Sequence, residues 1–411
     1  MLQPTEALEA ILARIPGPLG AEHVPLSEAL GRSLASAVAS DVDMPPFEKS
    51  AMDGYAVRSS DFAGGAFEEP SATEERELPC VGESRAGAPF EGAVPPFSCV
   101  AIYTGARVPK ECDAVVMVEH TRHEGRRVFF RGLPRSGLNV SHKAEVMAVG
   151  RTVFEPRRWL SAVDLSVLAA VGCDPVSVHQ RPVVSILTTG DELVEVKQRP
   201  GAGQIREGNT FYLRAACEQL GCAILDRGIV RDDAAALELA FRRALTEGDV
   251  LVTTGGVSMG RYDLVGPALE AVGVERVLHK VAIKPGKPIW FGMAGQKPVF
   301  GLPGNPVSAL LGFEAFVRPA LARLRGAPVE EERERFRVAR WLGEDRTAKD
   351  RQINLPVQVR QGRDGVEEAE PLPWKGSADI VALTGADGLA LVPPEQTIQK
   401  GALCLYRPLA L

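Results

Sequence analysis

Four polar or glycine-rich segments carry the side chains in this chain that could do chemistry. They are residues 189–192, 231–233, 254–263 and 303–306. Each follows an apolar run of strand composition, and helical patterns separate these runs along the chain. Strands and helices in this alternation are typical of a mainly parallel sheet covered on both faces. Because the carboxyl ends of parallel strands share one edge, where α/β folds bind ligands, we expect the four segments to form one site.

The glycine-rich segment 254–263 has the residues that suit an oxyanion. Gly255, Gly256 and Ser258 would place backbone N–H groups and a hydroxyl at the start of a helix, which favours phosphate. A tight turn is the alternative. In the segment Pro303-Gly304-Asn305-Pro306, Asn305 can act as N-cap and Pro306 as the first helical residue, so helix initiation alone explains part of this motif.

Charged side chains surround these segments. Lys280, Lys284 and Lys287 alternate with Pro and Gly, which favours a rigid turn that presents ammonium groups to an anion; a solvated lysine face is the alternative. The opposing carboxylates are Glu192, Asp232 and Asp263. Carboxylates beside phosphate-binding loops commonly hold Mg²⁺, although an acidic residue at a helix start is an ordinary alternative for Asp263.

Several common enzyme motifs are absent from the sequence. There is no Walker A loop, no Rossmann fingerprint, no nucleophile elbow and no H-E-x-x-H. The residues alone therefore indicate an α/β enzyme that acts on a phosphorylated ligand, with Mg²⁺.

The elements around this region divide the chain into parts. We expect a helix near residues 5–12 with Thr5 as its cap, further helices after Ser27 and at 159–171, and short strands at 100–103, 114–118 and 127–130. The predicted strands of the α/β region are 183–187, 223–229, 249–253, 276–283 and 298–302; its helices are 209–220, 233–246, 263–271 and 306–324. After a charged linker, short strands at 352–359, 388–392 and 402–406 predict a small C-terminal β domain.

Composition limits the classes of partner. The net charge of −6 and the pI near 5.7 argue against nucleic acid. No apolar run approaches the roughly 20 residues that cross a bilayer, and the N-terminus has no signal-peptide pattern. The seven scattered cysteines favour reduced thiols, so we expect a cytoplasmic protein with no membrane partner.

Blocks of sequence across nearly the whole chain resemble the MoeA family, which is shared with the E domains of gephyrin and of the plant molybdenum insertase. The blocks are 45–57 (PPFEKSAMDGYAV), 103–106 with 113–116, 189–193, 203–205, 255–260, 284–288 and 302–308. They occur in the family's order.

The resemblance implies a multi-domain α/β plus β fold and a homodimer. The implied domains are a discontinuous N-terminal domain (1–46 and 145–180), an inserted β domain (47–144), a MogA-like α/β pterin-binding domain (181–326) and a C-terminal β-barrel-like domain (327–411). The implied reaction is Mg²⁺-dependent transfer of molybdate to adenylylated molybdopterin with release of AMP. A MogA-type adenylyltransferase and apo-molybdoenzymes are the implied partners.

The resemblance also implies residue roles. The catalytic residues would be Asp53, Thr104, Glu192, Asp232 and Asp263, with Glu192 and Asp263 as Mg²⁺ ligands and Asp53 entering from the partner subunit. The substrate-binding residues would be Gly255, Gly256, Ser258, Lys280, Lys284, Lys287, Pro288, Pro303, Gly304, Asn305, Pro306, Ser308 and Ser377.

Two positions depart from the family pattern. Ser141 stands where an Arg is expected, and Val146 stands where an acidic residue is expected. We hypothesise that Glu145 substitutes for the missing carboxylate. These departures leave open a catalytically impaired or tungsten-preferring paralogue that binds the pterin.

Overall fold

The computed structural model describes residues 1–62, 75–257, 264–328, 330 and 335–409. Contacts within the chain divide it into two compact units. The first unit contains residues 1–36, 156–165 and 175–411, and the second contains residues 37–155 and 166–174. None of the helices in the described ranges is long and apolar enough to cross a bilayer.

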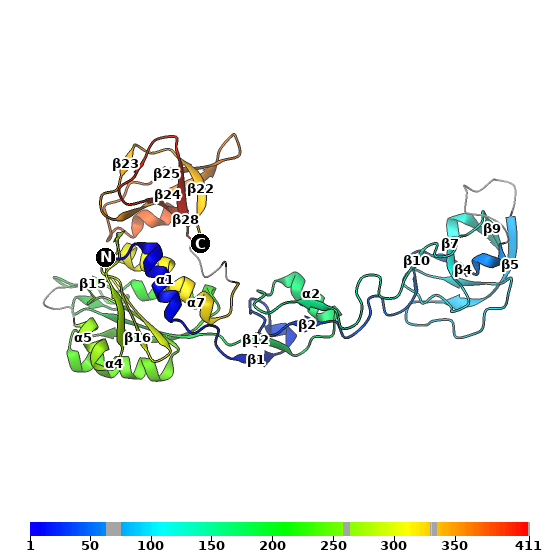
Figure 1. The fold of residues 1–411 in the computed structure, drawn as a ribbon, viewed down its shortest axis with the longest axis horizontal. Helices are drawn as coiled ribbons and strands as arrows, with labels where there is room; N and C mark the ends of the chain where they lie inside the picture. Colours follow the sequence, from blue (N-terminus) through cyan, green and yellow to red (C-terminus); the bar gives the residue numbers. More distant parts are fainter. Residues whose placement is uncertain (63–74, 258–263, 329, 331–334, 410–411) are drawn as a thin grey trace. The chain divides into compact units, whose positions relative to one another are not determined.

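A six-stranded sheet forms the centre of the first unit (Figure 1). Its order is β16 (Ala223–Val230), β13 (Val183–Thr189), β17 (Val250–Thr254), β21 (Lys297–Leu302), β20 (Trp290–Ala294) and β18 (Glu275–His279). The first four strands are parallel, whereas β20 and β18 are antiparallel to their neighbours. The parallel strands therefore end at one edge.

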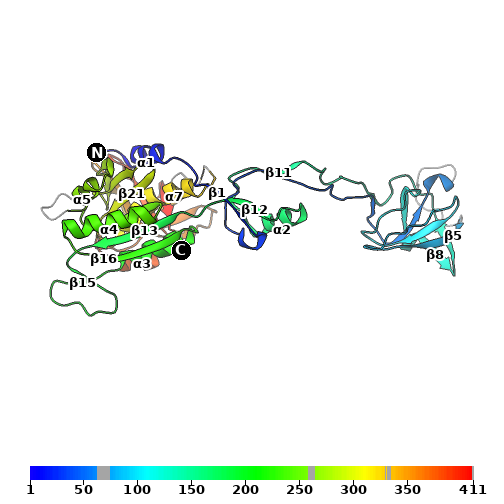
Figure 2. The same ribbon diagram turned by 90° about the horizontal axis from the view of Figure 1, so that it is seen from below.

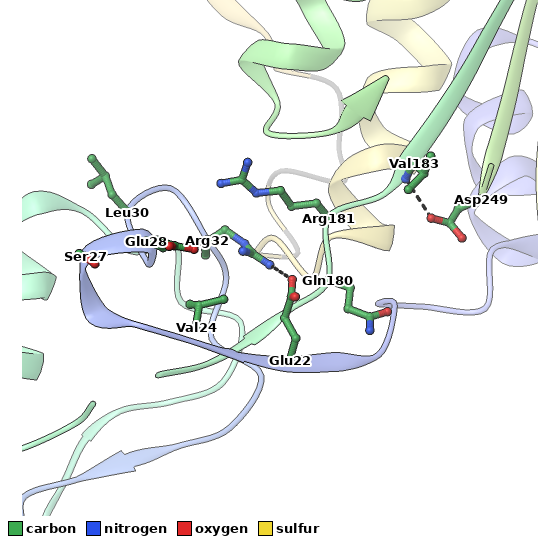
Figure 3. Close-up of a pocket in the computed structure, with 10 residues that line it drawn as sticks. All are labelled: Glu22, Val24, Ser27, Glu28, Leu30, Arg32, Gln180, Arg181, Val183 and Asp249. Atoms are coloured by element: carbon green, nitrogen blue, oxygen red, sulfur yellow. Dashed lines mark hydrogen bonds and ion pairs between the residues drawn. The ribbon is translucent and has the colours of Figure 1, made fainter. Parts of the chain in front are cut away.

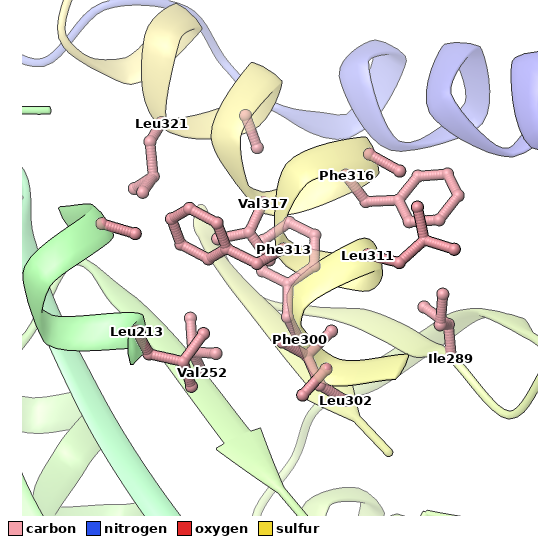
Figure 4. Packing of buried hydrophobic residues seen from close by; sticks show 14 of the residues in the cluster. Leu213, Val252, Ile289, Phe300, Leu302, Leu311, Phe313, Phe316, Val317 and Leu321 are labelled. Atoms are coloured by element: carbon pink, nitrogen blue, oxygen red, sulfur yellow. The ribbon is translucent and has the colours of Figure 1, made fainter. Parts of the chain in front are cut away.

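Helices cover both faces of this sheet (Figures 1 and 2). One face packs against α1 (Pro4–Arg14), α3 (Asn209–Gln219), α6 (Pro306–Gly312) and α7 (Arg318–Leu324). The other packs against α4 (Ala234–Glu247) and α5 (Val265–Ala271). Strand periodicity explains the division, because Val250 and Val252 join the first core while Leu251 between them joins the second. Figure 4 shows part of the first core, in which Phe313 and Phe316 belong to the same buried cluster as the sheet residue Phe300.

The C-terminal region forms a closed barrel. Its strands are β22 (Arg337–Trp341), β24 (Gln352–Gln361), β25 (Glu367–Pro371), β26 (Gly388–Val392) and β28 (Leu403–Pro408). The barrel closes because β24 pairs with both β25 and β26. The short strand β19 (Ile283–Lys284) pairs with β24 and so connects the α/β region to the barrel. Three short pairs also belong to the first unit: β1 (Ala21–Val24) with β12 (Val176–His179), β14 (Leu193–Val194) with β15 (Ile205–Arg206), and β23 (Arg346–Thr347) with β27 (Thr397–Ile398).

The second unit is built on another six-stranded sheet. Its order is β7 (Ala114–Met117), β4 (Gly54–Val57), β6 (Cys99–Ile102), β5 (Glu75–Ser84), β9 (Arg127–Arg131) and β8 (Thr121–Glu124). Smaller pairs join β2 (Val38–Ala39) to β11 (Thr152–Phe154), and β3 (Lys49–Ser50) to β10 (Val140–Ser141). The helix α2 (Ala162–Ala170) falls within the predicted range 159–171; its residues 162–165 belong to the first unit and residues 166–170 to the second.

The predicted fold class is confirmed, with several local corrections. The helix expected after Ser27 is wrong, because residues 26–28 form one 3₁₀ turn and Gly31 then adopts a φ of +66°. The single strand expected at 276–283 is also wrong, because Lys280 adopts a φ of +75° and separates β18 from β19. Thr5 does not cap the first helix; that helix begins at Pro4, and Glu6 accepts a hydrogen bond from the backbone N–H of Gln3 at 2.8 Å. The strands β20, β22 and β25 were not predicted.

The burial of phenylalanine side chains in the first core predicts that truncating one of them lowers the free energy of unfolding. Phe316 is completely buried, so Phe316→Ala should leave a cavity and lower the free energy of unfolding of the first unit by about 3–5 kcal/mol. Chemical denaturation of the full chain measures this loss. The control is Leu239→Ala, whose side chain is exposed on α4 and should change the free energy by less than about 0.5 kcal/mol. Equal effects of the two substitutions would contradict the assignment of Phe316 to the core.

Candidate functional site

A cavity of about 830 Å³ lies at the carboxyl edge of the parallel strands. All four of the segments that sequence analysis singled out contribute to it. The predicted site residues that line it are Glu192, Asp232, Gly255, Gly256, Pro288, Pro303, Gly304, Asn305 and Pro306. The parallel order of the strands is the physical reason that residues so far apart in sequence meet here.

Glu192 is placed by the loop that follows β13. A Cβ atom on Gly190 would lie 2.7 Å from the Glu192 Oε2 atom, so the carboxylate lies against the backbone of this glycine. The loop is held by two backbone hydrogen bonds, from Leu193 N to Gly190 O at 3.1 Å and from Ile205 N to Glu192 O at 2.9 Å. A carboxylate is thereby presented to the cavity from a short, hydrogen-bonded loop.

Asp232 is held by neighbouring residues of the same edge. Its Oδ1 atom accepts a hydrogen bond from the Thr189 hydroxyl at 2.5 Å, and its Oδ2 atom accepts one from Asp191 N at 3.4 Å. The adjacent residue Asp233 has a different role, because its side chain accepts the backbone N–H of Ala236 and caps α4. Asp232 therefore belongs to the cavity, whereas Asp233 belongs to the helix.

The glycine loop after β17 comes close to the loop after β13. Gly255 and Gly256 have φ values of +90° and +60°. A Cβ atom on Gly255 would lie 2.3 Å from the carbonyl oxygen of Thr189, so a side chain at this position would clash with backbone. The predicted residues Ser258 and Asp263 lie outside the described residues.

The loop after β21 is hydrogen-bonded to Ser377 of the C-terminal region. Asn305 was expected to cap the following helix with its side chain, and this is wrong: its Nδ2 group donates instead to the Ser377 hydroxyl at 3.0 Å. The free N–H of Val307 is satisfied by the carbonyl oxygen of Ser377, also at 3.0 Å. Asn209, at the start of α3, donates to Gly304 O at 2.8 Å. Pro306 occupies the first helical turn as expected.

The predicted lysine strip lies beside the cavity lining and does not contribute to it. The side chains of Lys284 and Lys287 are exposed, and Lys280 is half-buried. Their loop is closed by a backbone hydrogen bond from Val281 N to Lys287 O at 3.0 Å. Ser308 is buried in α6, where Gly286 packs against it.

The sequence analysis did not predict a buried hydrogen-bond network in the cavity wall, to which the lining residues Thr188, Glu207 and Thr254 belong. Glu207 is 7% exposed and accepts a hydrogen bond from Thr210 N at 2.8 Å. The Thr188 hydroxyl is 2.9 Å from that of Thr210 and 3.2 Å from that of Thr254. Thr188 and Thr254 lie at the ends of two apolar strands, and this position could have indicated that their hydroxyls take part in the site.

The predicted residues Asp53 and Thr104 both lie in the second unit and contact each other. Asp53 Oδ1 accepts hydrogen bonds from the Thr104 backbone N–H at 2.7 Å and from its hydroxyl at 2.8 Å. The backbone hydrogen bond first, and then the hydroxyl, lower the pKa of Asp53 below its ordinary value. Asp53 is therefore ionised throughout the neutral range.

The positions that depart from the family pattern also lie in the second unit. Val146 is exposed. Glu145 Oε2 accepts a hydrogen bond from His142 N at 3.0 Å, so this carboxylate closes its own turn. The hypothesis that Glu145 replaces a missing carboxylate stays a prediction.

A second cavity, of about 700 Å³, lies at the opposite edge of the α/β sheet, where β13 and β17 begin (Figure 3). Three of its charged side chains make hydrogen bonds to other groups of the protein. Arg32 donates to Glu22 and to the carbonyl oxygen of His179, and Asp249 accepts the N–H of Val183 at 2.9 Å. It lies far from the glycine loops, so we assign the site to the carboxyl edge.

The Asp53–Thr104 contact predicts a specific shift in titration. Thr104→Val removes the hydroxyl donor and keeps the backbone donor, so the pKa of Asp53 should rise yet stay below its ordinary value. The carboxylate ¹³C chemical shift against pH measures it, with Thr152→Val, at an exposed threonine of the same unit, as control. Because the folded-state pKa is lowered, the contact stabilises the unit above pH about 4 and loses this effect as pH falls through the folded-state value. An unchanged pKa in Thr104→Val would show that the hydroxyl has no effect.

Family models match most of the chain. The MoeA N-terminal region (domain I and II) matches residues 2–172, a probable molybdopterin binding domain matches residues 185–323, and the MoeA C-terminal region (domain IV) matches residues 342–409.

Relatives and solved structures agree with these matches. A molybdopterin molybdenumtransferase from Haemophilus influenzae is 39% identical over 79% of this chain and 78% of its own length. Another from Synechocystis sp. is 30% identical over 98% of both chains. The crystal structure of a molybdopterin biosynthesis MoeA protein from Pyrococcus horikosii has a TM-score of 0.85, with 30% identity over 99% of both chains. These matches, together with the fold, show that the chain belongs to the MoeA family.

Proposed function

We propose that this chain transfers molybdenum from molybdate to adenylylated molybdopterin and releases AMP. The observation that carries the proposal is the cavity that Glu192 and Asp232 line together with residues of the loops after β13, β17 and β21. Relatives of similar length that are named molybdopterin molybdenumtransferases support it.

The chemistry of the substrates fits this arrangement. A phosphoric anhydride and a metalate are both anions, so bringing them together requires groups that offset their repulsion. Backbone N–H groups of the glycine loop can stabilise such charge at the cavity. The exposed Lys284 and Lys287 do not line the cavity, but they add positive charge next to its lining residue Pro288. Cleavage of the anhydride by water breaks one P–O bond and gives AMP, leaving the pterin phosphate free.

Mg²⁺ fits the donors at this site only as a partly hydrated ion. Glu192 and Asp232 supply the hard oxygen ligands that Mg²⁺ prefers. Within the described ranges, no three His, Cys, Asp or Glu side chains are grouped so that they could hold a metal ion. Bound Mg²⁺ would supply positive charge beside the phosphates, with waters and substrate oxygens completing its coordination. Asp263 stays a proposed ligand.

We further propose a homodimer in which Asp53 and Thr104 of one subunit serve the cavity of the other. Their contact holds an ionised carboxylate on an exposed turn. A side chain that enters the cavity of another subunit has to be exposed in this way. A MogA-type adenylyltransferase would supply the adenylylated substrate, and apo-molybdoenzymes would receive the product. Both partners, and a cytoplasmic location, belong to this proposal.

Glu192→Gln tests the proposal directly. The substitution preserves shape and removes one of the two carboxylates proposed to hold Mg²⁺, so molybdate-dependent AMP release should fall at least about 100-fold. AMP is measured after mixing protein, adenylylated molybdopterin, Mg²⁺ and molybdate. The control is Glu195→Gln, an exposed carboxylate three residues further along that does not line the cavity, and it should retain parental activity.

The same assay separates the second candidate function, which the residues at 141 and 146 favour. A protein that binds the pterin tightly but releases no AMP with either molybdate or tungstate would be the impaired paralogue. Faster release with tungstate than with molybdate would identify the tungsten-preferring one. If Glu192→Gln releases AMP at the parental rate, the Glu192 carboxylate takes no part in the reaction.

A further inference from the structure

Tyr212 lies on the boundary between the candidate site and the hydrophobic core. It belongs to α3, lines the cavity, and packs against the core of the first unit. Its hydroxyl donates a hydrogen bond to Glu314 Oε1 at 2.6 Å. The hydroxyl therefore points into the protein, and the ring forms part of the cavity wall.

The acceptor of this hydrogen bond is one member of a buried ion pair. Arg318 donates to Glu314 from Nε at 2.6 Å and from Nη2 at 2.8 Å. The Glu314 and Arg318 side chains are 5% and 14% exposed. Glu314 also lies in a π-helical segment, Phe313–Val317, between α6 and α7. Because an unpaired buried charge is strongly unfavourable, the pair holds its geometry and fixes the acceptor for Tyr212.

A second contact restricts the ring of Tyr212. Phe313 packs against it edge to face, with ring centroids 5.8 Å apart and planes at 85°. Burial, followed by the nearby Glu314 charge, raises the pKa of the Tyr212 phenol well above its ordinary value, so the group stays a donor. The ring is thus held at its hydroxyl and against Phe313, and Tyr212 lines the same cavity as Ile205 and Ile380.

We propose that Tyr212 contacts a flat fused nitrogen heterocycle of the substrate, and that the Glu314–Arg318 pair positions its ring for this contact. The inference rests on the proposed function, whose substrate carries two such heterocycles, a pterin and an adenine. Rigid aromatic rings bind heterocycles through their π faces without the entropy cost of ordering a flexible side chain. Tyr212 is then a specificity residue, and Glu314 is a positioning residue.

The first test compares KM and kcat for AMP release. Tyr212→Ala should raise KM about tenfold, the effect expected for loss of one aromatic contact to a base, and leave kcat within about twofold. Tyr212→Leu keeps most of the side-chain volume and should also raise KM. This second variant tests the contact even if Tyr212→Ala does not fold. The matched control is Phe211→Ala, at an exposed aromatic residue on the same helix, which should not change KM. Unchanged KM in both folded Tyr212 variants overturns the inference.

The positioning role is tested by a double-mutant cycle. Glu314→Gln should raise KM about threefold in the parent and have no further effect on KM in the Tyr212→Ala background, because the contact that it positions is already lost. Equal effects in the two backgrounds would mean that Glu314 acts through the fold and would overturn its positioning role.

Binding of the separate halves identifies the heterocycle and separates this inference from the proposed function. Calorimetry with AMP alone and with molybdopterin alone compares the parent with Tyr212→Ala. Weaker binding of AMP assigns Tyr212 to the adenine, weaker binding of molybdopterin assigns it to the pterin, and either result supports the contact. Unchanged affinity for both ligands overturns it. An inactive parent protein that still loses affinity in Tyr212→Ala would contradict the proposed function and support the contact.

Discussion

The parallel order of β16, β13, β17 and β21 is the constraint on which the site depends. In a parallel sheet every strand ends at the same edge, so residues that follow separate strands meet although more than one hundred positions separate the first loop from the last. Parallel strands require helical crossovers, and these helices bury both faces of the sheet. The apolar composition of the strands is therefore the first cause of the site. The loops are free to carry polar residues because the strands and helices already supply the core.

The loops at this edge have fixed positions because the backbone of one loop packs against the backbone of the next. Gly255 approaches the carbonyl of Thr189 so closely that a side chain cannot fit, and Asp232 is fixed by the hydroxyl of the same threonine. Neighbouring loops thus support each other directly. The start of α6 extends this support to the C-terminal region, because Ser377 satisfies the N–H of Val307 and accepts a hydrogen bond from Asn305. Loops fixed in this way hold their polar groups in place before a ligand arrives, which is what stabilisation of developing charge requires.

Much of the fold and part of the site could be predicted from the sequence. The four parallel strands were predictable because buried strands and amphipathic helices have different periodicities, and the positions of Glu192 and Asp232 followed from the shared edge. Predictions from the local sequence pattern were wrong at positions where tertiary contacts determine the backbone conformation or the hydrogen-bond partner. Lys280 adopts a positive φ that divides the strand predicted at 276–283. Asn305 is the N-cap residue of α6, but its side chain donates to Ser377 instead of making a capping hydrogen bond. Glu207 was not predicted because a lone acidic residue before a helix gives no sign of burial.

The pair formed by Glu314 and Arg318 illustrates why such residues escape sequence analysis. A charged pair at this spacing on a helix ordinarily indicates a solvated face, yet here it lies in the most apolar part of the first unit. Replacing a buried pair by apolar residues is often neutral or stabilising, so stability alone does not explain its presence. A charged acceptor inside the core does explain why the Tyr212 hydroxyl points inward and its ring toward the cavity. Apolar substitutes would fill the same space, but they would leave that hydroxyl without its acceptor and the ring without a fixed position. The buried pair therefore has its clearest rationale in the site that it supports.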